Sequence, residues 1–343
     1  MDFTLSHEQQ MFAYTARTLF GDTCTPDHWR KMMERAIAFD AARWASMVEN
    51  GFTLLLLPEA AGGLGLGEVD FALIAQQAGY VALPEPLAES AGVGAPMLAA
   101  LAPDHPMLRE GAGIIAVAPR INPVVAHGDV ADAFLVEQDG RALLVPAAAA
   151  RLEKVETIDP LRRVFRLGWD AAAAEDLGEA NWGLAYDRAA LFAAAQGLGL
   201  AQRSVDLAVA YACERQQFGK PIGSYQAVKH HLASAQVAIE FARPVVMAAA
   251  AQIGAGCVLS RARVSHAKLA ALEAADVAAR AAIQVHGAMG YSWEVDVHLF
   301  LKRTLALTQA WGTPAWHRAR VAKRLFTRPV GPDQTFAGEL TDA

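Results

Sequence analysis

Glu214-Arg-Gln-Gln-Phe-Gly-Lys-Pro-Ile-Gly-Ser-Tyr-Gln-Ala-Val-Lys-His230 lies between two long alanine-rich segments. Its pattern predicts the last turn of one helix, carrying Arg215 and Phe218, then a break at Gly219 and Pro221 and a second helix carrying Gln226. A guanidinium can hold a diphosphate through two parallel hydrogen bonds, and Phe218 places an apolar surface beside it. Composition alone favours a capped helix end whose arginine pairs with a nearby carboxylate.

The flanking sequence predicts a helix bundle around this break. Long helical segments are expected at 184–217, 225–255 and 259–286, with a final one at 314–326. Short breaks between long helices are typical of an up-and-down bundle.

Towards the N-terminus, the first hundred residues predict amphipathic helices, while a strand pattern follows them. Ser6 with Gln9 forms a capping box, and Thr25-Pro-Asp and Phe39-Asp-Ala read as further helix starts. Short apolar runs between residues 113 and 146, with Asp139-Gly140 as a hairpin turn, predict a small antiparallel β-domain.

The predicted fold is therefore mainly α with a small β-domain. The sequence shows no strand–helix–strand alternation, which argues against a Rossmann-type sheet. We expect four regions: an all-α domain at 1–108, a β-domain at 109–180, a four-helix bundle at 181–330 and a tail at 331–343.

Composition excludes several classes of function. The 30 basic residues are outnumbered by 36 acidic ones and form no dense block, which argues against nucleic-acid binding. The N-terminus has no secretory pattern and apolar runs such as Phe52–Leu57 are too short to span a bilayer, so we expect a cytoplasmic protein without membrane insertion. The widely spaced Cys24, Cys213 and Cys257 are expected to be buried structural thiols.

Other motifs carry no chemistry in this interpretation. The glycine cluster at 62–67 fails the dinucleotide-binding pattern and is expected to be a loop. His230 and His231 point about 100° apart on a helix, so no metal site is predicted. Glu294 and Asp296 are expected to cap or flank a helix start, and no G-x-S-x-G motif is present.

Five stretches together resemble the acyl-CoA dehydrogenase family. They are the 214–230 segment, Ala194-Ala-Gln-Gly-Leu-Gly-Leu-Ala-Gln-Arg, Ala281-Ala-Ile-Gln-Val-His-Gly-Ala-Met-Gly-Tyr, Pro58-Glu-Ala-Ala-Gly-Gly-Leu-Gly and Ile158-Asp-Pro-Leu-Arg-Arg. The resemblance implies an N-terminal helical domain, a small β-domain and a C-terminal four-helix bundle. It also implies FAD as the cofactor, an acyl-CoA substrate and an electron-transfer acceptor.

The family's FAD contacts are carried over to six positions of this chain. They are Arg215, Phe218, Gln226, Gln284, Gly287 and Thr313. By resemblance, Arg215 and Phe218 contact the FAD of a neighbouring subunit, while Gln284 and Gly287 approach its diphosphate and adenosine. A glycine suits such a position because backbone without Cβ can come close to a ligand.

The carboxylate that removes the substrate's α-proton in the family has no counterpart here. Trp311 occupies the usual base position before Gly-Thr, and Ala189 occupies the alternative position. Asp187 lies two residues from Ala189, about 200° around the helix. The family's flavin-contacting Thr-Glu-Pro and Gly-Ser-Asp stretch is also missing around Ala116-Val-Ala-Pro-Arg. The catalytic residue is therefore unknown.

A heteromeric enzyme accounts for both departures. Gly290-Tyr-Ser-Trp-Glu-Val-Asp-Val-His-Leu-Phe-Leu-Lys-Arg and Pro314-Ala-Trp-His-Arg are similar to a bacterial subgroup whose subunits form heterotetramers and act on bulky steroid side chains. The resemblance implies a second subunit that supplies the base. Two alternatives remain open: a homo-oligomeric binding or scaffold protein without catalysis, and a homomeric dehydrogenase with a relocated base such as Asp187.

Overall fold

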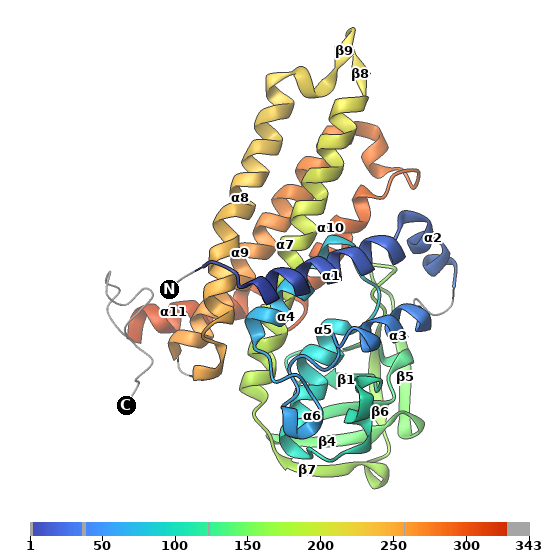
Figure 1. Ribbon diagram of the computed structural model, residues 1–343, viewed down its shortest axis with the longest axis vertical. Helices are drawn as coiled ribbons and strands as arrows, with labels where there is room; N and C mark the ends of the chain where they lie inside the picture. The colour runs from blue at the N-terminus through green and yellow to red at the C-terminus, as the bar shows by residue number, and fades with distance from the viewer. Residues whose placement is uncertain (1–2, 36–38, 123, 257, 328–343) are drawn as a thin grey trace.

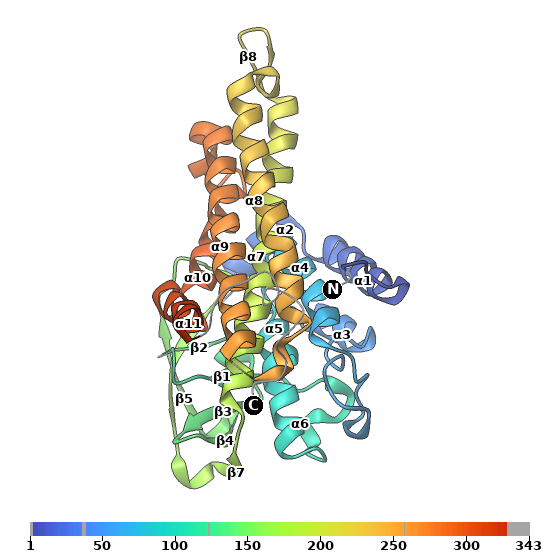
Figure 2. The same ribbon diagram turned by 90° about the vertical axis from the view of Figure 1, so that its left-hand side faces the viewer.

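A computed structural model describes residues 3–35, 39–122, 124–256 and 258–327. Helices α7 (Trp182–Glu214), α8 (Gln226–Ala250) and α9 (Val258–His286) run along its longest axis (Figure 1). Helix α10 (Val297–Gln309) packs against α7 and α9, and α11 (Pro314–Thr327) packs against α9. The sheets lie at one end of this axis and a small hairpin at the other (Figure 2). The mainly α architecture with a small β-domain and a helical bundle is confirmed.

The sequence predicted a helix start at Glu294 and Asp296 but not the extent of the helix that follows, α10. Asp296 stands at its N-cap position, but its side chain makes no capping bond. Instead its carboxylate accepts hydrogen bonds from Arg30 of helix α2 (Pro26–Glu34), at 2.9 and 3.0 Å. This stabilising contact joins residues far apart in sequence, so a local pattern could not reveal the ion pair. The expectation that Asp296 flanks a helix start is confirmed.

The N-terminal helices begin where the capping signals place them. Helix α1 (His7–Thr23) has the predicted capping box, α2 is capped by Thr25, and α3 (Ala41–Glu49) is capped by Asp40. Helix α4 (Glu68–Tyr80) follows the glycine-rich loop.

The helical stretch from Leu87 to Leu101 is interrupted. Helix α5 (Leu87–Glu89) passes into a π-helical turn, Ser90–Gly94, and then into α6 (Ala95–Leu101). A Cβ on Gly92 would lie 2.7 Å from Phe192 of α7. The widened turn therefore fits closely against α7. This packing constraint cannot be recognised from helical periodicity in the sequence.

Two glycines set the closest approach between the N-terminal helices and the bundle. A Cβ on Gly79 of α4 would lie 2.1 Å from the carbonyl oxygen of Gln196, and one on Gly199 of α7 would lie 2.0 Å from that of Gln76. Any side chain at either position would overlap backbone. The two helices therefore pack backbone against backbone at this crossing.

The β-domain contains two sheets. Strands β1 (Ile115–Ala118), β3 (Ala133–Gln138), β4 (Arg141–Pro146) and β7 (Glu175–Glu179) form one, while β2 (Val125–Ala126), β6 (Val164–Trp169) and β5 (Ala150–Val155) form the other. The predicted hairpin at Asp139-Gly140 is confirmed, with φ of 49° and 81°.

The prediction of a purely antiparallel β-domain was wrong for one pair, because β1 and β3 are parallel. The chain leaves the first sheet after β1 to form β2 in the second sheet. A crossover, rather than a hairpin, then returns it to β3.

Of the three cysteines, Cys24 is buried as predicted and accepts a hydrogen bond from the Trp29 indole at 3.1 Å. The prediction was wrong for Cys213, which is exposed near the end of α7. Cys257 lies outside the described residues.

Helix α8 has the length and mean hydropathy of a membrane-spanning helix, and only a third of its most apolar window is buried. It packs against α7 and α9 along one side. Val237 and Phe241 are exposed on it. This helix thus combines a packed face with an apolar face that meets solvent in the single chain.

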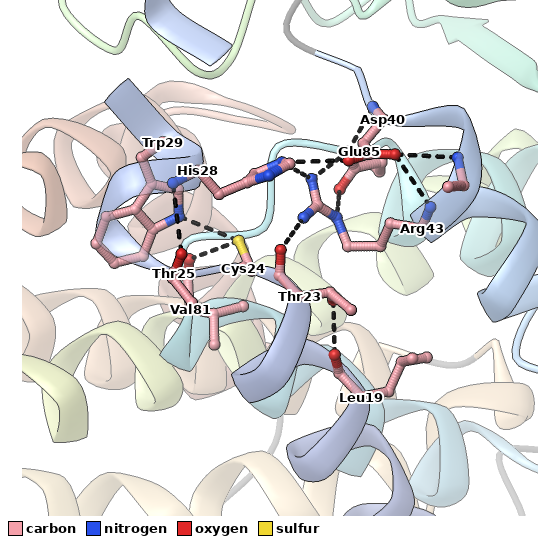
Figure 3. A network of polar contacts seen from close by, with 11 residues as sticks. Leu19, Thr23, Cys24, Thr25, His28, Trp29, Asp40, Arg43, Val81 and Glu85 are labelled. Atoms are coloured by element: carbon pink, nitrogen blue, oxygen red, sulfur yellow. Dashed lines mark hydrogen bonds and ion pairs between the residues drawn. The ribbon is translucent and has the colours of Figure 1, made fainter. Parts of the chain in front are cut away.

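A buried ion pair ties the N-terminal helices together (Figure 3). Arg43 of α3 donates two hydrogen bonds of 2.8 Å to Glu85 and one of 2.6 Å to the carbonyl of Thr23. His28 of α2 lies 2.6 Å from the same guanidinium, and burial lowers its pKa, as does the charge of Arg43. The side chains of Arg43 and Glu85 are almost completely shielded from water.

We predict that Glu85→Ala lowers the free energy of unfolding by about 3–5 kcal/mol, because Arg43 is left charged and unpaired in the interior. Urea unfolding measures the loss. Replacing both partners, as Arg43→Met with Glu85→Leu, should recover most of it. Glu153→Ala breaks the exposed pair with Arg166 and should cost less than about 1 kcal/mol. Equal losses in the two single variants would show that burial does not strengthen the Arg43 pair.

Candidate functional site

The segment that carries Arg215 and Phe218 is a hairpin rather than the end of a helix. Helix α7 ends at Glu214, and strands β8 (Gln216–Gln217) and β9 (Lys220–Pro221) follow it. Phe218 and Gly219, with φ of 52° and 81°, form the turn between them. The predicted placement of both residues in the last helical turn was therefore wrong, since two successive left-handed residues favour a tight hairpin.

This hairpin presents its side chains to solvent. Phe218 is 91% exposed, and Arg215 and Gln226 are exposed as well. Among the described residues, the guanidinium of Arg215 has no recorded hydrogen bond or ion pair. The hairpin lies at the far end of the bundle (Figure 1). It presents the cation of Arg215 and the ring of Phe218, which contacts Tyr225 edge-on.

The C-terminal end of α9 lies beside the hairpin end of α7. The rings of Tyr211 and His286 stack with centroids 4.2 Å apart. Gln284 is exposed, and Gly287 has φ of 61° with open space where a Cβ would be. We name Arg215, Phe218, Gln226, Gln284 and Gly287 the tip cluster; the structure brings these five predicted residues to one end of the molecule.

Thr313, the sixth predicted residue, lies beside a cleft at the other end of the molecule. The cleft has a volume of about 190 Å³ and opens where α5, the β-domain and α10 meet. Its lining residues are Glu89, Val117, Pro119, Asn122, Val124, Ala126, Thr157, Arg162, Val164, Ala306, Gln309, Ala310 and Trp311. Thr313 is exposed two residues beyond Trp311, and its hydroxyl accepts a hydrogen bond from the Trp316 amide at 3.3 Å.

The tip cluster and the cleft of one chain are far apart. Gly92, three residues beyond the cleft residue Glu89, packs against Phe192 of α7. Arg215 follows Phe192 by 23 positions, which corresponds to about 35 Å of helix at 1.5 Å per residue.

The turn that carries Trp311 is held by a buried lysine. Lys268 of α9 donates hydrogen bonds to the carbonyl oxygens of Ala310 and, at 2.8 Å, Gly312. Burial lowers the pKa of Lys268 to about 7. Trp311 itself has φ of 56° and is buried. A large side chain in a left-handed conformation therefore occupies the family's base position in a turn with little freedom to move.

His317 binds the remaining carbonyl of this turn. Its Nε2 lies 3.1 Å from the carbonyl oxygen of Trp311 and its Nδ1 lies 3.0 Å from the hydroxyl of Ser265. Since a carbonyl can only accept, Nε2 carries the proton and Nδ1 accepts from Ser265. Burial, and then the charge of Lys268, lower the pKa of His317 to about 3, so the ring is neutral.

Neither alternative base position reaches the cleft. Ala189 is buried in α7. The carboxylate of Asp187 is buried 2.6 Å from Arg320, and desolvation raises its pKa against the opposing charge of that arginine. Asp187 is not among the residues that line the cleft.

Sequence reasoning missed two charged residues in the cleft. Glu89 and Arg162 are both buried there, with 3.4 Å between Oε1 and Nη2. Arg162 belongs to the Asp-Pro-Leu-Arg-Arg motif quoted above. No signal in the sequence pairs it with a residue 73 positions away.

The described part of the chain contains no group of three or more histidine, cysteine or acidic side chains that could hold a metal ion.

Comparison with known protein families agrees with this geometry. Residues 6–104 match the N-terminal domain of acyl-CoA dehydrogenases, and residues 177–326 match the C-terminal domain. The chain belongs to the acyl-CoA dehydrogenase family. Enzymes of this family are oxidoreductases that act on acyl-CoA, and they are FAD-binding flavoproteins.

Individual relatives cover nearly the whole chain. The acyl-CoA dehydrogenase IpdE2 of Mycobacterium tuberculosis is 33% identical over 329 residues, which cover 95% of this chain and 100% of that protein. The ChsE4–ChsE5 complex of the same organism has a chain with a TM-score of 0.86 and 25% identity, covering 96% of this chain and 100% of that one. A variant of the Tcur3481–Tcur3483 steroid acyl-CoA dehydrogenase has a TM-score of 0.82 at 23% identity, covering 94% and 99%.

The tip cluster and the cleft differ in how well they suit FAD. The tip cluster fits a diphosphate and adenosine, since it offers an unpaired guanidinium, an exposed ring and open space over Gly287. The cleft does not fit a flavin ring together with a substrate, because about 190 Å³ is below the range of ligand pockets.

We predict that acid destabilises the protein partly through His317. Its folded pKa of about 3 lies below the ordinary 6.5, so the unfolded chain binds more protons between these values. The free energy of unfolding therefore falls as pH falls through that window, by about 1 kcal/mol per pH unit for this group.

Urea unfolding at pH 7 and pH 5 tests this, and His317→Gln should flatten the slope. His230→Gln serves as the control and should leave it unchanged, because that side chain is exposed before and after unfolding. A variant at position 317 with the wild-type slope would show that the ring is protonated in the folded state.

Proposed function

We propose that this chain is one subunit of a heterotetrameric FAD-dependent acyl-CoA dehydrogenase, built as a dimer of heterodimers. The reaction is α,β-dehydrogenation of an acyl-CoA thioester. The observation that carries the proposal is the separation of the tip cluster from a cleft that has Trp311 in place of the base. A span of about 35 Å exceeds the distance between the diphosphate and the ring of one dinucleotide. A cofactor held by Arg215 therefore has its ring in the cleft of another chain.

In this arrangement the chain binds and orients the cofactor. Arg215 would hold the diphosphate, because a guanidinium can donate two parallel hydrogen bonds to it, and Phe218 would offer an apolar face beside it. Gly287 lets the backbone approach without a Cβ in the way. When bound, FAD supplies the acceptor for the hydride that leaves the substrate's β-carbon. The partner subunit contributes the carboxylate that takes the α-proton.

The partner docks on apolar surface that the single chain leaves exposed. Val237 and Phe241 on α8 are large apolar side chains in contact with solvent, and obligate interfaces bury such surface. The likeness to the ChsE4–ChsE5 complex supports a heteromeric assembly. We further propose a steroid side-chain thioester as the substrate, from the sequence resemblance and the likeness to a steroid acyl-CoA dehydrogenase, and an electron-transfer protein as the acceptor.

We predict that the purified chain alone is colourless and that co-expression with its partner yields a yellow complex. Arg215→Ala should lower the FAD content of that complex at least tenfold, because it removes charge-assisted hydrogen bonds of about 1.5–3 kcal/mol each. Absorbance of the flavin after gel filtration gives the stoichiometry.

Arg166→Ala, an exposed arginine on β6, serves as the control and should leave the flavin content unchanged. A stable but colourless complex would support the scaffold protein instead. A yellow, active chain without any partner would support a homomeric enzyme.

We predict that Asp187→Asn leaves turnover of the co-expressed complex intact. Asp187 is engaged by Arg320 and does not line the cleft, so neutralising it removes an ion pair and no catalytic group. Steady-state turnover is the measurement, with the melting temperature as a check on folding. Loss of turnover in a well-folded variant would identify Asp187 as a relocated base.

A further inference from the structure

The cleft beside Trp311 contains a charged pair in mostly apolar surroundings. Val117, Val164 and Trp311 contribute apolar surface, whereas Glu89 and Arg162 are the charged residues among its lining. Both are at least nine-tenths buried, with Arg162 only 8% exposed. A ligand in this cleft therefore meets largely hydrocarbon walls, one charged pair and the polar residues Asn122, Thr157 and Gln309.

This pair is looser than the other buried arginine–carboxylate pairs. Arg43 binds Glu85 through two contacts of 2.8 Å, and Arg163 binds Asp129 at 2.5 and 2.7 Å. Arg162 and Glu89 are 3.4 Å apart, whereas a charge-assisted hydrogen bond measures about 2.7–2.9 Å. The pair that faces the cleft is thus only weakly hydrogen-bonded, so each group keeps capacity to bond a polar atom that approaches from the cleft.

Arg162 also retains unused donor capacity. Within the described residues its guanidinium donates one hydrogen bond, to Glu89, and its Nε is buried without a partner. A guanidinium carries five N–H donors. A buried donor without an acceptor is destabilising, so an added oxygen atom that accepts from it would bind favourably.

We propose that Glu89 and Arg162 form a recognition site for a hydroxyl group on a small, mostly hydrocarbon ligand. The hydroxyl donates its hydrogen to the carboxylate of Glu89 and accepts a hydrogen bond from Arg162. A ketone can satisfy only Arg162, and a carboxylate meets the negative charge of Glu89. The cleft volume of about 190 Å³ limits the ligand to a single ring or a short branched chain.

This assignment concerns the chain's own cleft and requires neither FAD nor the partner subunit. The hydroxyl can belong to a free alcohol or to the acyl group of a CoA thioester. In both sources the same pair recognises the same group. A binding experiment without turnover therefore tests it separately from the dehydrogenase function.

Saturation-transfer NMR with cyclohexanol and chlorocyclohexane at millimolar concentration tests the site. Cyclohexanol should bind about tenfold more tightly, since it gains hydrogen bonds at a buried pair. Glu89→Leu combined with Arg162→Leu should abolish this preference without leaving a lone buried charge. Glu89→Gln, which keeps the side-chain shape, should reduce it and covers the case in which the double variant does not fold.

A matched control removes another ion pair away from the cleft. Glu68→Leu with Arg188→Leu breaks a pair of 2.8 Å and should leave the preference for cyclohexanol unchanged. Equal binding of both probes by the wild-type chain, or an unchanged preference in Glu89→Gln and in the double variant, would overturn the proposal.

A second pair of probes distinguishes the two sources. These are the CoA thioesters of 4-hydroxycyclohexanecarboxylate and cyclohexanecarboxylate. A tenfold advantage of the hydroxylated thioester that is lost in Glu89→Gln assigns the site to an acyl group. The same advantage confined to cyclohexanol assigns it to a free alcohol.

Discussion

The hydrogen bonds from Lys268 and His317 to three successive carbonyls fix the geometry on which the rest of the cleft depends. Their donors are buried and come from α9 and α11, so the turn 310–312 is anchored to two helices of the C-terminal half. Trp311 is thereby held in a left-handed conformation against the β-domain and α5. The wall that the 310–312 turn contributes to the cleft follows from this one constraint.

Sequence patterns located the features that are encoded locally. Ser6 with Gln9, Thr25 and Asp40 predicted helix starts because a cap needs only residues two or three positions apart. Asp139-Gly140 predicted a hairpin for the same reason. By contrast, α10 begins at an ion pair with Arg30, and the parallel pairing of β1 with β3 requires a crossover. Such long-range determinants leave no short-range signature.

In the candidate site, too, some features could be predicted from short motifs and others depend on long-range contacts. Resemblance to the family named six residues, and the structure places five of them together in the tip cluster. Arg215 and Phe218 lie on a hairpin instead of a helix end, whereas Gln226, Gln284 and Gly287 lie at or just beyond the ends of α8 and α9. The separation of that cluster from the cleft could not be read from the motifs, because it depends on the length and straightness of α7. The pairing of Glu89 with Arg162 also escaped prediction, since it joins the N-terminal helices to the β-domain.

Helix α7 connects the β-domain end of the chain to the tip without interruption over 33 residues. The length of this helix therefore sets the distance and the angle between the β-domain and the hairpin. Inserting or deleting one residue after Phe192 would turn the hairpin by about 100° and shift it by about 1.5 Å, so Arg215 would point away from any surface that it serves. Insertions or deletions in α7 are therefore tolerated only when their length is close to a whole number of helical turns. The solvent-facing loops of the β-domain do not have that restriction.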